Sequence, residues 1–299
     1  MTTKKKPTIV WFCAITCNGN THSLLSANSS RFELLLNNFD FIYHPSLTID
    51  KSLEDILNQE EKIDFLLVEG SISSNKDFFT INEDSTFNHL NKLASKSNYI
   101  ISVGSCASFG GVHAKFTQND DVCSINKAIN KDIIKNLKHN IINLTGCPVH
   151  PEWILQTLFT LKTFGKISID EIGRPKELYG MLAHHGCTRN EYFEWKVEGD
   201  FGQKEGCLFS EQGYRAPMTN SVCNKILWND ISSKTRAGSP CLGCTEFDFP
   251  RRALYETQKN MSLPQTPFGI SKRAYYTLAG VAKSFKIDRL EKKLIDEDN

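Results

Sequence analysis

The chain has 299 residues, of which 40% are hydrophobic and 23% charged, and its formal net charge at pH 7 is +1. This length and composition predict an ordered protein with one large domain or two unequal ones, and the small net charge excludes the polycationic footprint of a nucleic-acid binder. No apolar run approaches the roughly 20 residues that a membrane-spanning helix needs.

Three lysines precede the first apolar run, which is short and indicates a first β-strand instead of the core of an export signal. We therefore expect a cytoplasmic protein. Ten cysteines in such a chain are poor candidates for a disulfide framework, because the cytosol keeps thiols reduced. Metal binding or redox chemistry is the better interpretation.

The first half of the chain repeats one pattern: a short apolar strand, a glycine-containing loop and a polar stretch with helical periodicity. This alternation is typical of parallel α/β proteins. It predicts strands over residues 8–12, 39–43, 64–68, 99–103 and 140–144. It predicts helices over residues 26–36, 53–60, 86–97, 125–137 and 152–164, the last with Pro151 at its start.

Cysteines follow three of these strands. Cys17, Cys106 and Cys147 lie after the first, fourth and fifth strands, and Glu69 follows the third. Loops at the carboxyl ends of parallel strands line one crevice, so the three thiols are expected to converge. The sequence predicts a flavodoxin-like sheet whose crevice holds an iron-sulfur cluster in place of a flavin.

The composition changes after about residue 172, where Gly, Pro and charged residues become frequent and five cysteines lie between Cys187 and Cys244. Such a segment cannot build a large apolar core, and metal clusters would hold its irregular backbone. The expected fold class is α/β, a flavodoxin-like parallel sheet domain followed by an irregular, cluster-stabilised C-terminal domain. The expected domains are 1–170, 171–263 and a tail over 264–299, with a helix over 274–285.

The order and spacing of the motifs resemble the small subunit of nickel-iron hydrogenases, over residues 7–250. The motifs that carry the resemblance are Cys17-Asn18-Gly19-Asn20, Glu69-Gly70-Ser71, Gly104-Ser105-Cys106, Gly146-Cys147-Pro148, His184 with Cys187, Cys207, Cys223 and Cys241-Leu242-Gly243-Cys244.

The resemblance implies an iron-sulfur electron-transfer subunit of a hydrogenase, of the cytoplasmic uptake or high-affinity type. Electrons from hydrogen oxidation would pass to an external acceptor, a quinone or a redox protein. The nickel-iron centre belongs to a separate large subunit in this family, so the chain is not expected to be catalytic alone. A higher oligomer of heterodimers is expected.

The resemblance also implies three clusters in a line, called proximal, medial and distal. Their ligands would be Cys17, Cys106 and Cys147 for the proximal cluster, Cys223, Cys241 and Cys244 for the medial cluster, and His184, Cys187 and Cys207 for the distal cluster. A histidine that replaces a thiolate removes negative charge and raises the reduction potential, which suits the exit end.

Other residues near the motifs have ordinary interpretations. Glu69 is either a hydrogen-bonded brace or a residue that helps protons or water reach the partner. Cys13 and Cys123 are read as non-ligands. His185 is the alternative to His184, but the family's spacing selects His184. The pair Cys241 and Cys244 could be half of a zinc site, although no second pair of cysteines at zinc-ribbon spacing completes it.

The chain departs from the family's pattern at two expected cysteines. Asn20 stands at the second position of the usual Cys-x-x-Cys motif, and Gly213-Tyr214 stand where a further distal cysteine is expected. The medial set has three cysteines, with Lys234 near the place of a fourth in some relatives. Three ligands favour 3Fe-4S at each site. The alternative at the proximal and distal sites is 4Fe-4S, if Asn20 or residues near Tyr214 ligate.

Two other functions compete with this one. The chain could be the small subunit of a hydrogen-sensing regulatory hydrogenase, which would turn over slowly and bind a kinase-like partner. It could also be a cluster-bearing subunit of another oxidoreductase complex. The medial and distal motifs disfavour the second alternative, because such modules retain only the first cluster.

Overall fold

The computed structural model describes residues 5–251, apart from 49, 78, 117–120, 138, 140, 196 and 210–211, together with residues 254, 274 and 277. The chain divides into two compact units. The first comprises Met1–Leu178 with Thr245–Pro250, and the second comprises the remainder. The predicted helix over 274–285 lies, apart from residues 274 and 277, outside the described residues.

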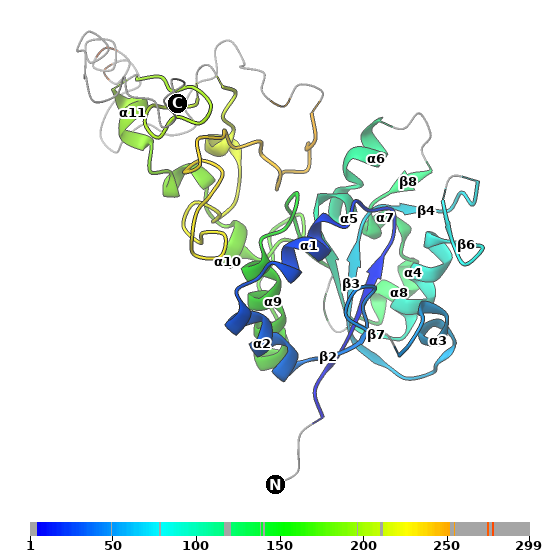
Figure 1. Ribbon diagram of the computed structural model, residues 1–299. Helices are drawn as coiled ribbons and strands as arrows, with labels where there is room; N and C mark the ends of the chain where they lie inside the picture. Colours follow the sequence, from blue (N-terminus) through cyan, green and yellow to red (C-terminus); the bar gives the residue numbers. More distant parts are fainter. Residues whose placement is uncertain are drawn as a thin grey trace, which may run out of the picture. The chain divides into compact units, whose positions relative to one another are not determined.

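A five-stranded parallel sheet forms the centre of the first unit (Figure 1). Its spatial order is β2-β1-β3-β7-β9, which is the strand order of flavodoxin-like folds. Each strand lies where the sequence predicts one: β1 (Thr8–Cys13), β2 (Asp40–Tyr43), β3 (Ile63–Glu69), β7 (Ser97–Val103) and β9 (Ile142–Leu144). The central strands read as continuous apolar runs because helices cover both faces of the sheet.

Helices lie on both sides of this sheet. One side carries α1 (Gly19–Leu25), α2 (Ser29–Asn38) and α9 (Pro151–Phe164), and the other carries α3 (Leu53–Asn58), α4 (Thr86–Ser95), α7 (Ile125–Ala128) and α8 (Lys131–Lys135) (Figure 1). Between β7 and α7 lie α5 (Ser105–Phe109) and α6 (Gly111–Phe116). Two short antiparallel pairs, β4 (Ile72–Ser73) with β8 (Val122–Cys123) and β5 (Thr80–Ile81) with β6 (Asp84–Ser85), complete the unit.

Two helix predictions need correction. The helix predicted over 26–36 is α2, which begins at Ser29, where the Asn28 side chain accepts a hydrogen bond from Ser30 N. An additional helix that was not predicted, α1, precedes it. The prediction of a single helix over 125–137 is wrong, because the backbone turns at Ile129 and Asn130. The turn buries the Ile129 side chain and lets Asn130 N donate to Asn91 Oδ1 at 2.9 Å.

The second unit has little regular structure among its described residues. It contains η1 (Ala183–Gly186), α11 (Asn190–Glu194) and η2 (Ala216–Met218), and α10 (Lys176–Tyr179) leads into it. Its apolar cluster is small and includes the side chains of Cys207 and Cys241. None of the described helices combines the length and the apolar character needed to cross a membrane.

Candidate metal centres

Three predicted ligands lie at the carboxyl edge of the parallel sheet. Cys17 is in the loop after β1, Cys106 is in α5 after β7, and Cys147 is in the loop after β9. Ser105 N donates to Gly146 O at 2.9 Å, which ties the Cys106 helix to the Cys147 loop. Burial raises the pKa of the Cys106 thiol, and a negative charge on Cys17 adds to the increase. The fold therefore brings these loops together.

Two glycines shape this edge around the thiols. A Cβ on Gly111, whose φ is +54°, would collide with Cys106 Sγ. A Cβ on Gly19 would lie 3.3 Å from Cys17 Sγ. The backbone therefore lies close to both sulfur atoms, and a side chain at Gly111 would displace the Cys106 thiol.

The Asn20 side chain makes hydrogen bonds to other residues of the chain. Asn20 is 8% exposed, its Oδ1 accepts from Val149 N at 2.9 Å, and its Nδ2 donates to Val103 O at 3.2 Å and to Glu69 Oε1 at 3.3 Å. The amide thus links three chain segments that converge on this edge. Its oxygen already accepts a hydrogen bond, which argues against Asn20 as a metal ligand.

Glu69 is the centre of a buried hydrogen-bond network. Its side chain has no exposed surface and accepts hydrogen bonds from the side chains of Trp11 (3.2 Å), Thr16 (3.0 Å) and Thr21 (2.6 Å). It also accepts from the backbone amides of Asn20 (2.9 Å) and Thr21 (3.1 Å). These contacts favour the brace interpretation of Glu69, because they fix the loop that carries Cys17.

The predicted medial ligands lie together in the second unit. Burial raises the pKa of the Cys241 thiol to about 12, and charges on Cys223 and Cys244 add to the increase. Burial also raises the pKa of the Cys223 thiol, and the positive charge of Lys234 partly offsets this increase. Buried thiols of this kind are costly to ionise alone, and a bound metal removes that cost by replacing the proton.

The predicted distal ligands form another group in the same unit. Cys187 follows η1, where Cys187 N donates to His184 O at 3.0 Å. Burial raises the pKa of the Cys207 thiol to about 12, and a charge on Cys187 contributes. His185 is exposed, whereas Nδ1 of His184 is buried without a hydrogen-bond partner among the described residues.

The buried Nδ1 of His184, without a hydrogen-bond partner in the described part of the chain, shows whether the predicted distal ligands suit an iron-sulfur cluster. Burial lowers the pKa of the His184 imidazole to about 4, so the ring is neutral at pH 7 and keeps a free lone pair. A neutral imidazole nitrogen and thiolates are the donors that iron-sulfur clusters take. Within the described part of the chain no three His, Cys, Asp or Glu side chains meet as ligands of a single ion. A cluster has several irons, each with its own ligand, so its ligands need not meet at one point.

Sequence reasoning missed Arg189, which lies beside the distal thiols. The guanidinium is 3% exposed and donates to four carbonyl oxygens: Thr235 O at 2.9 Å, Glu205 O at 3.1 Å, Gly206 O at 2.8 Å and Gln203 O. Negative charges on Cys187 and Cys207 oppose the fall in its pKa that burial causes. Among the described residues no carboxylate pairs with it. Its position two residues after Cys187 was the only signal in the sequence.

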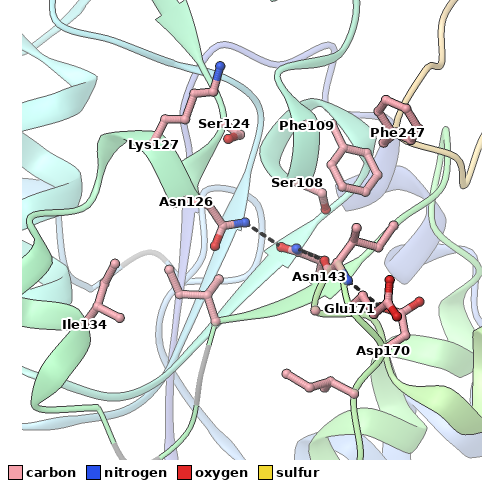
Figure 2. A pocket seen from close by; sticks show the side chains of 14 residues that line it. Ser108, Phe109, Ser124, Asn126, Lys127, Ile134, Asn143, Asp170, Glu171 and Phe247 are labelled. Atoms are coloured by element: carbon pink, nitrogen blue, oxygen red, sulfur yellow. Dashed lines mark hydrogen bonds between the residues drawn. The ribbon is translucent and has the colours of Figure 1, made fainter.

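A separate cavity of about 580 Å³ lies beside the edge strand β9 (Figure 2). Its lining includes Phe109, Lys127 and Phe247, and Asn126 Nδ2 donates to Asn143 Oδ1 at 3.3 Å in its wall. None of the described residues that line it is a predicted ligand. The cavity is therefore distinct from the three ligand groups.

Two protein families match consecutive parts of the chain. The family described as NADH ubiquinone oxidoreductase, 20 Kd subunit, matches residues 17–161, which contain the proximal group. The C-terminal family of the NiFe/NiFeSe hydrogenase small subunit matches residues 179–256, which contain the medial and distal groups.

Individual proteins agree with these matches. The chain is 30% identical over 263 residues to the periplasmic NiFe hydrogenase small subunit 1 of Nitratidesulfovibrio vulgaris, covering 83% of this chain and 81% of the relative. It is 30% identical over 260 residues to the quinone-reactive Ni/Fe-hydrogenase small chain of Wolinella succinogenes, covering 81% and 71%. It also superposes on a reduced, active form of the Ni-Fe-Se hydrogenase from Desulfomicrobium baculatum with a TM-score of 0.74 and 25% identity, covering 85% of this chain and 100% of that one.

Proposed function

The chain belongs to the small subunits of nickel-iron hydrogenases, and from this we propose that it conducts electrons from a large subunit, where hydrogen is oxidised, to an external acceptor. The observation that supports the proposal most is that predicted ligands interact electrostatically within each set. Cys106 interacts with Cys17, Cys207 with Cys187, and Cys241 with Cys223 and Cys244. Iron-sulfur clusters supply one-electron transfer when bound. The enzyme is the complex of both subunits.

The residues of the chain have separate roles in this proposal. Cys17, Cys106 and Cys147 hold the proximal cluster, and the Glu69 network fixes the loop that presents Cys17. The medial and distal ligands are those predicted from the resemblance. The hydrogen bonds of the Asn20 amide support a proximal site with three protein ligands, and hence 3Fe-4S and about nine irons in three clusters of this type.

The acceptor and the compartment are further parts of the proposal. One similar chain is named quinone-reactive, which supports a quinone as acceptor. The compartment proposed is the cytoplasm, whose reducing conditions keep cysteine thiols available as metal ligands. Another similar chain is named periplasmic, so fractionation of cells is the required test.

The function is tested by purifying the chain with its natural large subunit and measuring iron, hydrogen-dependent dye reduction and hydrogen-isotope exchange. The complex should reduce the dye, and the isolated chain should not. His184→Ala should slow acceptor reduction while isotope exchange at the large subunit stays largely intact, because His184 lies at the exit. His185→Ala, at the exposed neighbouring position, is the matched control. Hydrogen oxidation by the isolated chain would overturn the proposal.

A further inference from the structure

Tyr214 lies among the predicted distal ligands and has an unexplained hydroxyl group. The residue is 2% exposed, and its hydroxyl has no hydrogen-bond partner among the described residues. A buried hydroxyl without a partner costs free energy, so such a group in a native protein points to a partner that is not part of the polypeptide. The question is which group that partner is.

The surroundings of the ring limit the answer. The rings of Tyr214 and His184 lie with centroids 6.3 Å apart and tilted by 64°. Tyr214 packs in one apolar cluster with Cys207, and Cys187 packs against the same cluster. Tyr214 therefore lies in the same part of the second unit as all three predicted distal ligands.

The hydroxyl itself lies beside sulfur. The side chains of Cys187 and Thr235 are the polar neighbours of the Tyr214 hydroxyl, although neither reaches it with hydrogen-bond geometry, and Cys241 belongs to the same apolar cluster. A phenol carries its proton at neutral pH and is therefore a donor. The acceptors available to it in a loaded site are the thiolate and sulfide sulfurs of the metal group.

We propose that Tyr214 is a positioning residue of the distal site and not a ligand, an inference that rests on the proposed function. Its hydroxyl donates a hydrogen bond to a sulfur of the group held by His184, Cys187 and Cys207. Hydrogen bonds to the sulfurs of an iron-sulfur cluster are among the features that set its reduction potential. A donor stabilises the more negative, reduced cluster. Tyr214 therefore raises the potential of the last site before the acceptor.

The test is a potentiometric titration of the complete enzyme followed by electron paramagnetic resonance, with iron counted per complex. Tyr214→Phe removes only the hydroxyl. It should leave the iron content unchanged and make reduction of the distal cluster about tenfold less favourable, which for one electron is about 59 mV. Tyr179→Phe makes the same change at another buried tyrosine of the second unit, outside this cluster, and should leave the distal potential unchanged.

Tyr214→Met, which keeps an apolar side chain without the hydroxyl, is the second variant if the first does not assemble. An unchanged distal potential in a fully loaded variant would overturn this inference alone. Loss of one iron in Tyr214→Phe would also overturn it, because Tyr214 would then be a ligand. A wild-type complex without iron-sulfur signals would overturn both this inference and the proposed function.

Discussion

Replacing Asn20 by aspartate keeps the shape of the side chain and turns its amide donor into an oxygen. In the wild type that donor lies 3.3 Å from Glu69 Oε1 and 3.2 Å from Val103 O. In the variant an oxygen faces two acceptors, and two hydrogen bonds worth about 1 kcal/mol each are lost. Two buried carboxylates 3.3 Å apart repel by about 5 kcal/mol at an effective dielectric constant of about 20.

Proton uptake limits this cost. One of the two carboxylates takes up a proton instead of remaining charged, which at pH 7 costs about 4 kcal/mol for a group that titrates near 4 in the unfolded chain. The protonated carboxyl can donate again and restores one hydrogen bond. We expect Asn20→Asp to lower the free energy of unfolding by about 4 to 5 kcal/mol at pH 7, and by only about 1 kcal/mol near pH 4, where the proton is freely available.

The assay is a thermal melt of the purified complex at pH 7 and at pH 5, followed by tryptophan fluorescence. A loss of this size lowers the melting temperature by roughly 10 °C at pH 7, with partial recovery at pH 5. Asn20→Ala removes three hydrogen bonds without adding charge, so its loss of about 3 kcal/mol should not depend on pH. Neither variant should change the iron content. An aspartate variant as stable as the wild type and holding an additional iron would refute the reasoning, because the side chain would then reach the metal.

Three further predictions follow from buried groups. Burial lowers the pKa of His44 to about 4, below the unfolded value of about 6.5. The folded chain should therefore lose about 3 kcal/mol of stability as pH falls from about 6.5 to about 4, and thermal melts of His44→Asn over this pH range should show a smaller loss. Gly111→Ala should displace the Cys106 thiol and remove about three irons in metal analysis, whereas Gly202→Ala, where no atom lies within 4 Å of the added Cβ, should keep them all. Arg189→Met should make reduction of the distal cluster about tenfold less favourable in a redox titration, with a smaller change in Arg189→Lys, which keeps the charge.

The strands were predictable because their signal is local. Each strand of the parallel sheet is a short apolar run that stands out from its polar neighbours, and a sheet covered on both faces requires such runs. The helix α1 was missed because Gly19, Asn20 and Thr21 have low helix propensity, and tertiary contacts to Glu69 hold them there.

The site was less accessible to sequence reasoning because its contacts are long-range. Asn20 bonds to partners 49, 83 and 129 residues away, so no local pattern could show that its amide is already committed. The orphaned hydroxyl of Tyr214 likewise depends on how the second unit folds back on itself. The sequence indicates only that a cysteine is absent at each of these two places.

The apolar cluster of the second unit has a consequence for the biogenesis of the enzyme. Cys207 and Cys241 are themselves members of that cluster, and Cys187 and Cys223 pack against it, so predicted metal ligands form part of this apolar core. The first unit has a large apolar core of its own, which contains none of the predicted ligands. We therefore expect iron delivery to fill a site at the sheet edge of a first unit that is already folded, and to complete the folding of the second unit. Starvation for iron should leave a chain whose first unit resists proteases while its second is digested.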